Sequence, residues 1–251
     1  MLLLAVGSFM VAVLISAGWL AGGEANPPDK GTPAITLPAL PPTRAPERPP
    51  APPTPAIPTP TPTQQVILPN TPTVSNGMRV GIVAGHAGND AGAVCDDGLT
   101  EAEVNLAVAQ WAVTLLRQRG YQVDLLDEFD ARLAGYRADA LVSIHADSCQ
   151  VPGASGFKVA RVTDSAIPDA EDRLVNCIYQ EYENATGMAR HPNSVTDNMT
   201  NYHAFREIQA DTPGAIIEMG FLLDDRIMLT EHSQQLAQGI VAGIGCFLER
   251  R

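Results

Sequence analysis

The hydrophobic and polar positions after Met78 follow two alternating patterns, one typical of strands and one typical of helices. Short apolar runs bounded by glycine or polar residues indicate buried strands. One such run starts at Arg79, and the others are residues 121–126, 140–147, 156–162 and 215–221. Helical spacing of apolar residues follows Thr100 and recurs over residues 169–186 and 234–248. The alternation predicts a single three-layer α/β domain with a mostly parallel central sheet and helices on both faces.

The first of these helices has recognisable start and stop signals. Thr100 and Glu103 have the spacing of a capping box, which places Glu101 in the first helical turn. Gly120 is positioned as the terminator. The apolar face of this helix is expected to lie in the core, and it is formed by Val104, Val108, Trp111 and Leu115.

The N-terminal third has a different composition from the rest. Leu2 to Gly23 contains no charged side chain and is long enough to cross a bilayer as a helix. Most of the chain's 21 prolines lie between Pro27 and Pro72, where no aromatic residue is present to form a core. We therefore expect a transmembrane anchor or cleaved signal segment at 1–23, a disordered Pro/Thr-rich linker at 24–77 and a catalytic domain at 78–251.

The charge of the chain restricts its partners. A net charge of −12 and a pI of about 4.7 argue against a nucleic-acid partner, because phosphate binding requires clustered Lys and Arg. Acidity alone does not identify a substrate, since excess carboxylate commonly serves only to keep a surface solvated. The apolar N-terminus predicts contact with a membrane and an extracytoplasmic location in the cell envelope for the rest of the chain.

Three residues offer metal-ligating chemistry at positions that the predicted fold brings to one edge. His86 follows the first strand, Glu101 begins the first helix and His145 stands at or near the end of another strand. In open α/β sheets, ligands bind outside the carboxyl ends of the strands. Two imidazoles and one carboxylate are a ligand set of hydrolytic zinc sites, so the sequence predicts one zinc ion here.

Each of these residues also has a simpler interpretation. A histidine at a strand end is often only hydrogen-bonded, and a carboxylate such as Glu101 stabilises a helix N-terminus by about 0.3–1 kcal/mol. Asp90 and Asp147 are candidates to orient the ligand imidazoles from outside the metal site, although turn residues have the same pattern. We place the other histidines outside the ligand set: His191, His203 and His232.

Four sequence segments together resemble the zinc-dependent N-acetylmuramoyl-L-alanine amidases, from about Met78 to Arg251. The segments are GHAGNDAG, GLTEAEVNL, SIHAD and PGAIIEMGF. The resemblance implies that His86, Glu101 and His145 bind zinc and that Glu218 is the catalytic carboxylate. It also implies that the substrate is peptidoglycan, cut between N-acetylmuramic acid and L-alanine. The substrate-binding residues and any protein activator are not identified by the resemblance.

The interpretation of Glu218 has an alternative in the residues themselves. An ionisable group in an apolar strand is costly unless it has a partner or a catalytic task, and Arg206 is a candidate partner. The chain also departs from the family pattern, because Ala87 replaces a common glycine and Asp127 stands where arginine often occurs. The segment 129–139 is shortened. These departures leave the expected ligands and Glu218 intact.

The four cysteines allow three complete disulfide pairings in an exported protein. Cys95 follows the His86 loop and Cys149 follows His145, so we expect these two to form a bridge. Alternatively, a cysteine thiolate completes a closed, structural zinc site. Cys177 and Cys246 lie on predicted helices and are expected to be buried as small apolar groups.

Two other functions are compatible with the same residues. A zinc carboxypeptidase acting on peptidoglycan stem peptides would use the same metal site, and it would release amino acids rather than free lactyl termini. A non-catalytic, anchored wall-binding protein would need neither an open metal site nor Glu218. The presence of Glu218 favours an enzyme over the second of these.

Overall fold

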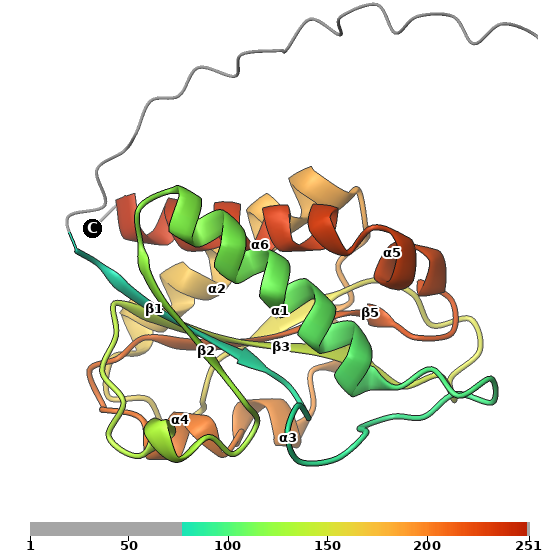
Figure 1. The fold of residues 1–251 in the computed structure, drawn as a ribbon, viewed down its shortest axis with the longest axis horizontal. Helices are drawn as coiled ribbons and strands as arrows, with labels where there is room; N and C mark the ends of the chain where they lie inside the picture. Colours follow the sequence, from blue (N-terminus) through green and yellow to red (C-terminus); the bar gives the residue numbers. More distant parts are fainter. Residues whose placement is uncertain (1–76, 250–251) are drawn as a thin grey trace, which may run out of the picture. The chain divides into compact units, whose positions relative to one another are not determined.

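The computed structural model describes residues 77–249, so the predicted anchor and nearly all of the predicted linker lie outside the described residues. The described chain forms one sheet with helices packed against it (Figure 1). Its strands are β1 (Arg79–Ala84), β2 (Gln122–Leu126), β3 (Ala140–Asp147), β4 (Lys158–Ala160) and β5 (Gly214–Phe221). Its longer helices are α1 (Glu101–Gln118), α2 (Pro168–Thr186), α5 (Arg226–Glu231) and α6 (Ser233–Glu249). The shorter ones are η1 (Ala131–Leu133), η2 (Pro192–Ser194), α3 (Asp197–Thr200) and α4 (Ala204–Glu207).

The sheet has the strand order β2-β1-β3-β5-β4 and confirms the expected α/β class. β1 pairs in parallel with β2 and β3, and β3 pairs in parallel with β5. β4 is antiparallel to β5 and forms an edge of the sheet. The carboxyl ends of β1, β3 and β5 therefore lie along one edge, which is where the predicted site residues should meet.

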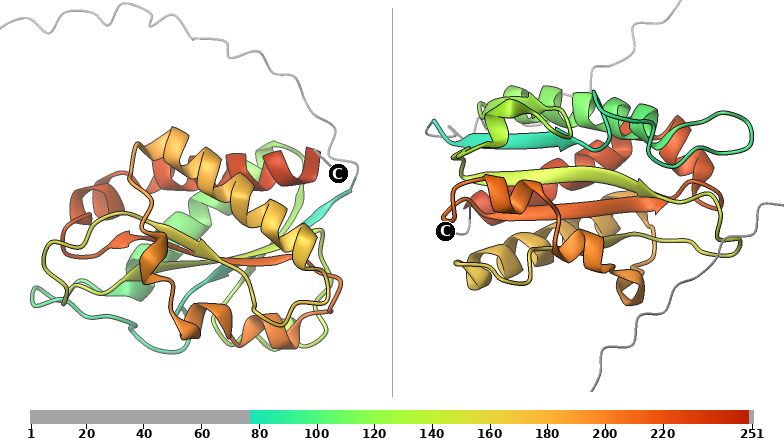
Figure 2. Two further views of the ribbon diagram at one scale, coloured as in Figure 1. Left: turned by 180° about the vertical axis from the view of Figure 1, so that it is seen from behind. Right: turned by 90° about the horizontal axis from the view of Figure 1, so that it is seen from below.

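Alternating side chains of the strands divide the core between the two faces of the sheet. Ile82 and Ile144 belong to the larger apolar cluster, together with residues of α1, α2 and α6. Val83 and Leu141, on the same two strands, point to the other face and belong to a smaller cluster with residues near α3 and α4. The long helices thus cover one face and the short helices the other, as Figure 1 and the left view of Figure 2 show. Helices on both faces are as predicted, although the two layers differ in thickness.

Helix α6 packs very closely on α2 because it carries glycine at the contact. A Cβ at Gly239 would lie 2.9 Å from the Cα of Tyr182, and one at Gly243 would lie 2.7 Å from the Cα of Ile178. Both distances are shorter than real Cβ contacts allow, so these glycines permit the approach. Gly245 differs, because a Cβ there would meet only the ends of flexible side chains, at 3.5 Å or more.

The boundaries of α1 match the sequence signals, but one side chain does not lie where the pattern placed it. The Thr100 side chain caps the helix, and Glu103 completes the capping box. Trp111 was expected in the core and is instead 40% exposed. The apolar spacing places it at the margin of the buried face, where the adjacent Ala112 occupies the contact with the core.

Within residues 77–249, no helix combines the length and apolar character needed to span a membrane.

Candidate functional site

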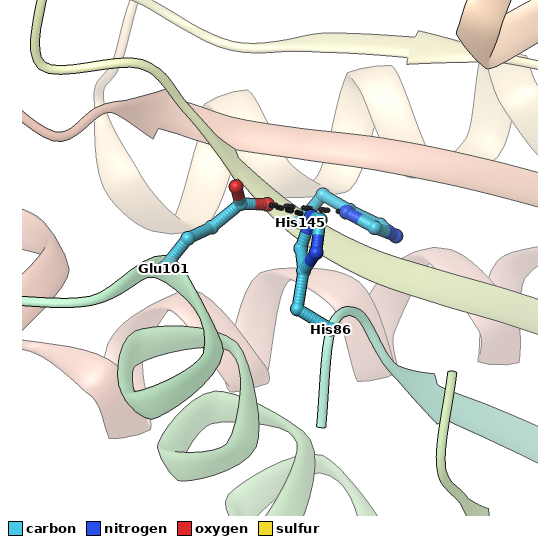
Figure 3. A group of neighbouring side chains, drawn as sticks. All are labelled: His86, Glu101 and His145. Atoms are coloured by element: carbon cyan, nitrogen blue, oxygen red, sulfur yellow. Dashed lines mark hydrogen bonds and ion pairs between the residues drawn. The ribbon is translucent and has the colours of Figure 1, made fainter. Parts of the chain in front are cut away.

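Three elements bring the predicted ligand residues together at the carboxyl edge of the sheet. His86 follows β1 in a tight turn, and among the described non-glycine residues it is the one with a positive φ, 65°. Glu101 is the first residue of α1, and His145 lies near the end of β3. A left-handed conformation is unfavourable for a residue with a Cβ, so the surrounding contacts must hold His86 in place. The three side chains point toward one another (Figure 3).

Their ligand atoms converge on a single carboxylate oxygen. His145 Nδ1 lies 3.1 Å and His86 Nε2 lies 3.3 Å from Glu101 Oε1. One possible ligand atom from each residue lies within 4.8 Å of the other two. This spacing is short enough for the three side chains to share one metal ion.

The electrostatics of the group favour positive charge between its members. Burial raises the pKa of Glu101, but hydrogen bonds from His145 and His86 outweigh it and hold that pKa well below its usual range. The hydrogen bond to Glu101 raises the pKa of His86 to about 9. Burial lowers the pKa of His145, and the hydrogen bond to Glu101 and the nearby acids reverse this into a net rise. A buried anionic carboxylate that attracts protons onto two imidazoles attracts a divalent cation for the same reason.

Glycines leave the space that this group occupies. A Cβ at Gly85 would lie 2.4 Å from His145 Cε1, and a Cβ at Gly92 would lie 2.7 Å from Glu101 Oε2. Any larger residue at either position would displace a side chain of the group. Asn105, one turn along α1, donates from Nδ2 to Glu101 Oε1 at 3.2 Å and to the Gly85 carbonyl at 3.1 Å. The group is therefore crowded, largely buried and held in place, as a metal site requires.

Of the two aspartates considered as orienting groups, one contacts a histidine and one does not. Asp90 Oδ1 lies 2.6 Å from His86 Nδ1 and accepts the Gly92 N–H at 2.7 Å. Because Asp90 contacts Nδ1 of His86, the other ring nitrogen, Nε2, faces Glu101. Asp147 instead forms an ion pair with Lys158, which is almost completely buried. Of these two candidates, Asp147 is therefore not supported as a group that orients an imidazole, because its carboxylate pairs with Lys158.

Glu218 lies on β5 and is the Cα partner of His145 on β3. Its Oε2 is buried and has no hydrogen-bond partner. Burial raises the pKa of Glu218 to about 7, although His145 and Lys158 act in the opposite direction. Among the described residues no ion pair joins Glu218 to Arg206, so the alternative of a structural charge pair with Arg206 is not supported.

Sequence reasoning missed Glu128, which is 5% exposed and lies beside His86 and His145. Its Oε2 accepts the His86 backbone N–H at 2.9 Å, and its Oε1 lies 3.1 Å from His203 Nε2. The available signal was its position two residues after β2, because that strand ends at the same edge of the sheet. His191 Nδ1 contacts Ser194 instead of the site. Among the described residues, the group that could hold a metal ion consists of His86, Glu101 and His145 and does not include His191, His203 or His232.

All four cysteines form disulfides. The Cys95–Cys149 bridge is as predicted, and it joins the loop before Glu101 to the loop after His145. Cys177 and Cys246 were expected to be unpaired apolar groups, but they join α2 to α6. The close packing of these two helices brings their Cα atoms to 5.7 Å, a distance that periodicity along one helix does not reveal. Disulfide-bonded sulfurs also exclude the alternative of a thiolate-closed zinc site.

Comparison with known proteins matches this chain to one family model, to curated relatives and to solved structures. The family model described as N-acetylmuramoyl-L-alanine amidase matches residues 80–246. The protein YqiI of Bacillus subtilis is 28% identical over 187 residues, which is 69% of this chain and 86% of YqiI. The N-acetylmuramoyl-L-alanine amidase AmiC of Neisseria meningitidis is 31% identical over 135 residues, which is 49% of this chain but only 32% of AmiC.

A solved structure supports the same assignment. This chain is similar to the crystal structure of an N-acetylmuramoyl-L-alanine amidase from Clostridium difficile 630. The match covers 70% of this chain and 100% of the Clostridium difficile chain. The TM-score is 0.59 and the sequence identity is 27%. Since the family model also matches most of the 251 residues, this chain belongs to the N-acetylmuramoyl-L-alanine amidase family, a family of hydrolases.

Proposed function

We propose that this chain is a zinc-dependent hydrolase that cuts the amide bond between N-acetylmuramic acid and L-alanine in peptidoglycan. The observation that carries the proposal is the convergence of His86, Glu101 and His145, with Glu218 on the adjacent strand. Two imidazoles and one carboxylate are the protein ligands of several hydrolytic zinc sites. Family membership supports the same reaction.

The three side chains have distinct tasks in this proposal. His86 offers Nε2, His145 offers Nδ1 and Glu101 offers Oε1 to one ion. Bound by three protein groups, zinc would supply Lewis acidity and lower the pKa of a coordinated water to about 7. The negative charge of Glu101 and the tight glycine-lined loops keep the ligand atoms close together before the ion arrives.

Glu218 is the proposed proton carrier. Its buried Oε2 has no hydrogen-bond partner among the described residues, so no protein group competes for the proton that this proposal assigns to it. A pKa of about 7 suits a group that first accepts a proton from the attacking water and then donates one. The proton goes to the departing nitrogen of L-alanine, because an amide nitrogen leaves readily only as the neutral amine.

The choice of peptidoglycan rests on the family rather than on the zinc chemistry. AmiC and the Clostridium difficile protein are both named N-acetylmuramoyl-L-alanine amidases. Zinc with a carboxylate would also hydrolyse other amides, and pocket shape must select among them. A zinc carboxypeptidase acting on stem peptides is the second enzymatic candidate, and a non-catalytic wall-binding protein is the third.

We also propose the arrangement of the whole chain. Residues 1–23 anchor it to a membrane or act as a signal segment, residues 24–77 form the linker, and residues 78–251 form the catalytic domain. A proline-rich linker in the polyproline II conformation extends by about 3.1 Å per residue, so it allows the catalytic domain to reach the wall from an anchored start. This arrangement predicts an extracytoplasmic location in the cell envelope.

Digestion of purified peptidoglycan by the full chain tests the reaction. We expect free lactyl termini on intact glycan strands and release of stem peptides beginning with L-alanine. Chelation should abolish this release, and added Zn²⁺ should restore it. Release of single amino acids would instead indicate the carboxypeptidase, and wall binding without cleavage would indicate the non-catalytic protein.

Glu218→Gln tests the assigned role of the carboxylate. We expect turnover to fall by about 10²- to 10⁴-fold, because the amide side chain cannot accept the proton. The matched control is Glu171→Gln. Glu171 is also a buried glutamate, but it contacts Gly214 at the opposite end of β5, away from the metal group. Turnover by Glu218→Gln equal to that of Glu171→Gln would contradict the proposal.

A further inference from the structure

In each proposed histidine ligand, one ring nitrogen faces Glu101, and the two histidines differ in whether the other ring nitrogen has a hydrogen-bond partner. His86 presents Nε2 to Glu101, while its Nδ1 lies 2.6 Å from Asp90. His145 presents Nδ1 to Glu101, while its Nε2 is buried and has no hydrogen-bond partner. A neutral imidazole that binds a metal through one nitrogen carries its proton on the other. His145 therefore needs an acceptor near Nε2.

The carboxylate that faces this nitrogen is Glu128. Its Oε2 lies 3.6 Å from His145 Nε2, just beyond hydrogen-bond distance, and the two side chains are 7% exposed each. A shift of a few tenths of an ångström would complete the bond. The same Oε2 accepts the backbone N–H of His86 at 2.9 Å. One buried oxygen thus contacts the backbone of one proposed ligand and faces the ring of the other.

Glu128 is itself held in place from the opposite side. Its Oε1 lies 3.1 Å from His203 Nε2, and His203 Nδ1 lies 2.8 Å from Glu207. The Phe129 ring stacks on His203 with a centroid separation of 4.2 Å. Tyr202 packs against the His203 ring with a centroid separation of 4.6 Å, and the nearby Glu128 adds to the rise that burial causes in the pKa of Tyr202. These contacts restrict the rotamers of Glu128 and orient its Oε2 toward the histidines.

We infer that Glu128 is the positioning residue of the metal centre: it fixes the ring of His145 through Nε2 and the left-handed turn of His86 through its backbone N–H. The inference rests on the proposed zinc site, because it assigns a role toward the same ligands. Glu128 makes no contact with the ion in this role. Its effect is on how tightly, and in what geometry, the ligands hold the metal.

Zinc affinity of the full chain provides the test, measured by competition with a chromophoric chelator. We expect Glu128→Gln to weaken Zn²⁺ binding by about 10- to 100-fold, as is typical when the acceptor behind a ligand histidine is lost. Glu128→Asp keeps the charge and should recover part of the affinity. The matched control is Glu171→Gln, which removes an equally buried carboxylate at the far end of the sheet and should leave Zn²⁺ affinity unchanged.

A spectroscopic measurement separates positioning from general stability. In the Co²⁺-loaded protein, Glu128→Gln should change the visible absorption bands, which report ligand geometry, and Glu171→Gln should not. Wild-type Zn²⁺ affinity and an unchanged Co²⁺ spectrum in Glu128→Gln would overturn the inference. Failure of metal-free Glu128→Gln to fold, followed by circular dichroism, would also overturn it, because Glu128 would then stabilise the fold rather than the ligands.

The same experiment distinguishes this inference from the proposed function. If the wild-type chain binds no Zn²⁺, the zinc hydrolase itself is wrong. If the wild-type chain binds Zn²⁺ and Glu128→Gln binds it equally well, only the role of Glu128 is wrong.

Discussion

Glu218 and His145 face each other as Cα partners on the neighbouring parallel strands β5 and β3. Lys158, at the start of β4, is the partner of Glu218 on its other side. The sheet therefore places a partly buried acid between an imidazole of the proposed metal site and a buried cation. Strand register, rather than a flexible loop, fixes the distance from the proposed proton carrier to His145.

The acid limb of the pH–rate profile follows from this position. Burial raises the pKa of Glu218 to about 7. The carboxylate form, which accepts the proton, increases as the pH rises through that value, so kcat/KM should rise with it. A bound cation attracts the carboxylate and lowers its pKa, so we expect the midpoint at or below pH 7. Rates of release from peptidoglycan between pH 4 and 9 provide the measurement, and a rate that falls over this limb would contradict the assignment.

The two disulfides should differ in their effect on the metal site. They close loops of similar length, with separations of 54 and 69 residues, so loss of either should lower the free energy of unfolding by about 2–4 kcal/mol. Cys95→Ala with Cys149→Ala should also weaken Zn²⁺ binding, because that bridge joins the loops next to Glu101 and His145. Cys177→Ala with Cys246→Ala is the matched control and should leave Zn²⁺ affinity unchanged. Denaturant unfolding and chelator competition measure the two effects.

Two glycines of α6 provide a test of the helix packing. Gly243→Ala places a Cβ 2.7 Å from the Ile178 backbone of α2 and should lower the free energy of unfolding by about 1–3 kcal/mol. Gly245→Ala meets only the ends of side chains, and it should raise the free energy of unfolding by up to about 1 kcal/mol through helix propensity. Urea unfolding of both variants measures the difference, and equal effects would show that α6 does not depend on this close contact.

Glu171 should make stability depend on pH in the opposite sense to a salt-bridged acid. Burial raises its pKa, although contacts with Ser165 and the Gly214 N–H partly offset this. Protonated Glu171 therefore contributes to the free energy of unfolding at pH values below the pKa that Glu171 has in the unfolded chain. This contribution is lost as the pH rises through the higher pKa that Glu171 has in the folded protein. Glutamine does not titrate, so the Glu171→Gln variant lacks this pH-dependent loss. Its free energy of unfolding relative to that of the wild type should therefore increase from pH 4 to pH 8. Thermal unfolding at both pH values tests the sign.

Much of the fold could be predicted from residues whose signals are local. Thr100 and Glu103 fixed the start of α1, and the apolar runs ending near His86 and His145 predicted the strands that carry them. Trp111 shows the limit of local pattern. Helical spacing predicts which face of α1 is buried, but it does not predict which residues lie at the exposed edge of that face. The pairing of Cys177 with Cys246 was missed because it depends on how closely two helices approach.

The sequence by itself determined the α/β class, the family and the identity of the candidate ligands, because these depend on periodicity and on the order of short motifs along the chain. Only the tertiary structure decided which polar side chains form hydrogen bonds and ion pairs with one another. Asp147 pairs with Lys158 instead of a histidine, and Glu128, distant in sequence, lies behind His145. Such contacts join residues from different strands and loops, and their distances exist only once the sheet has set the register of its strands.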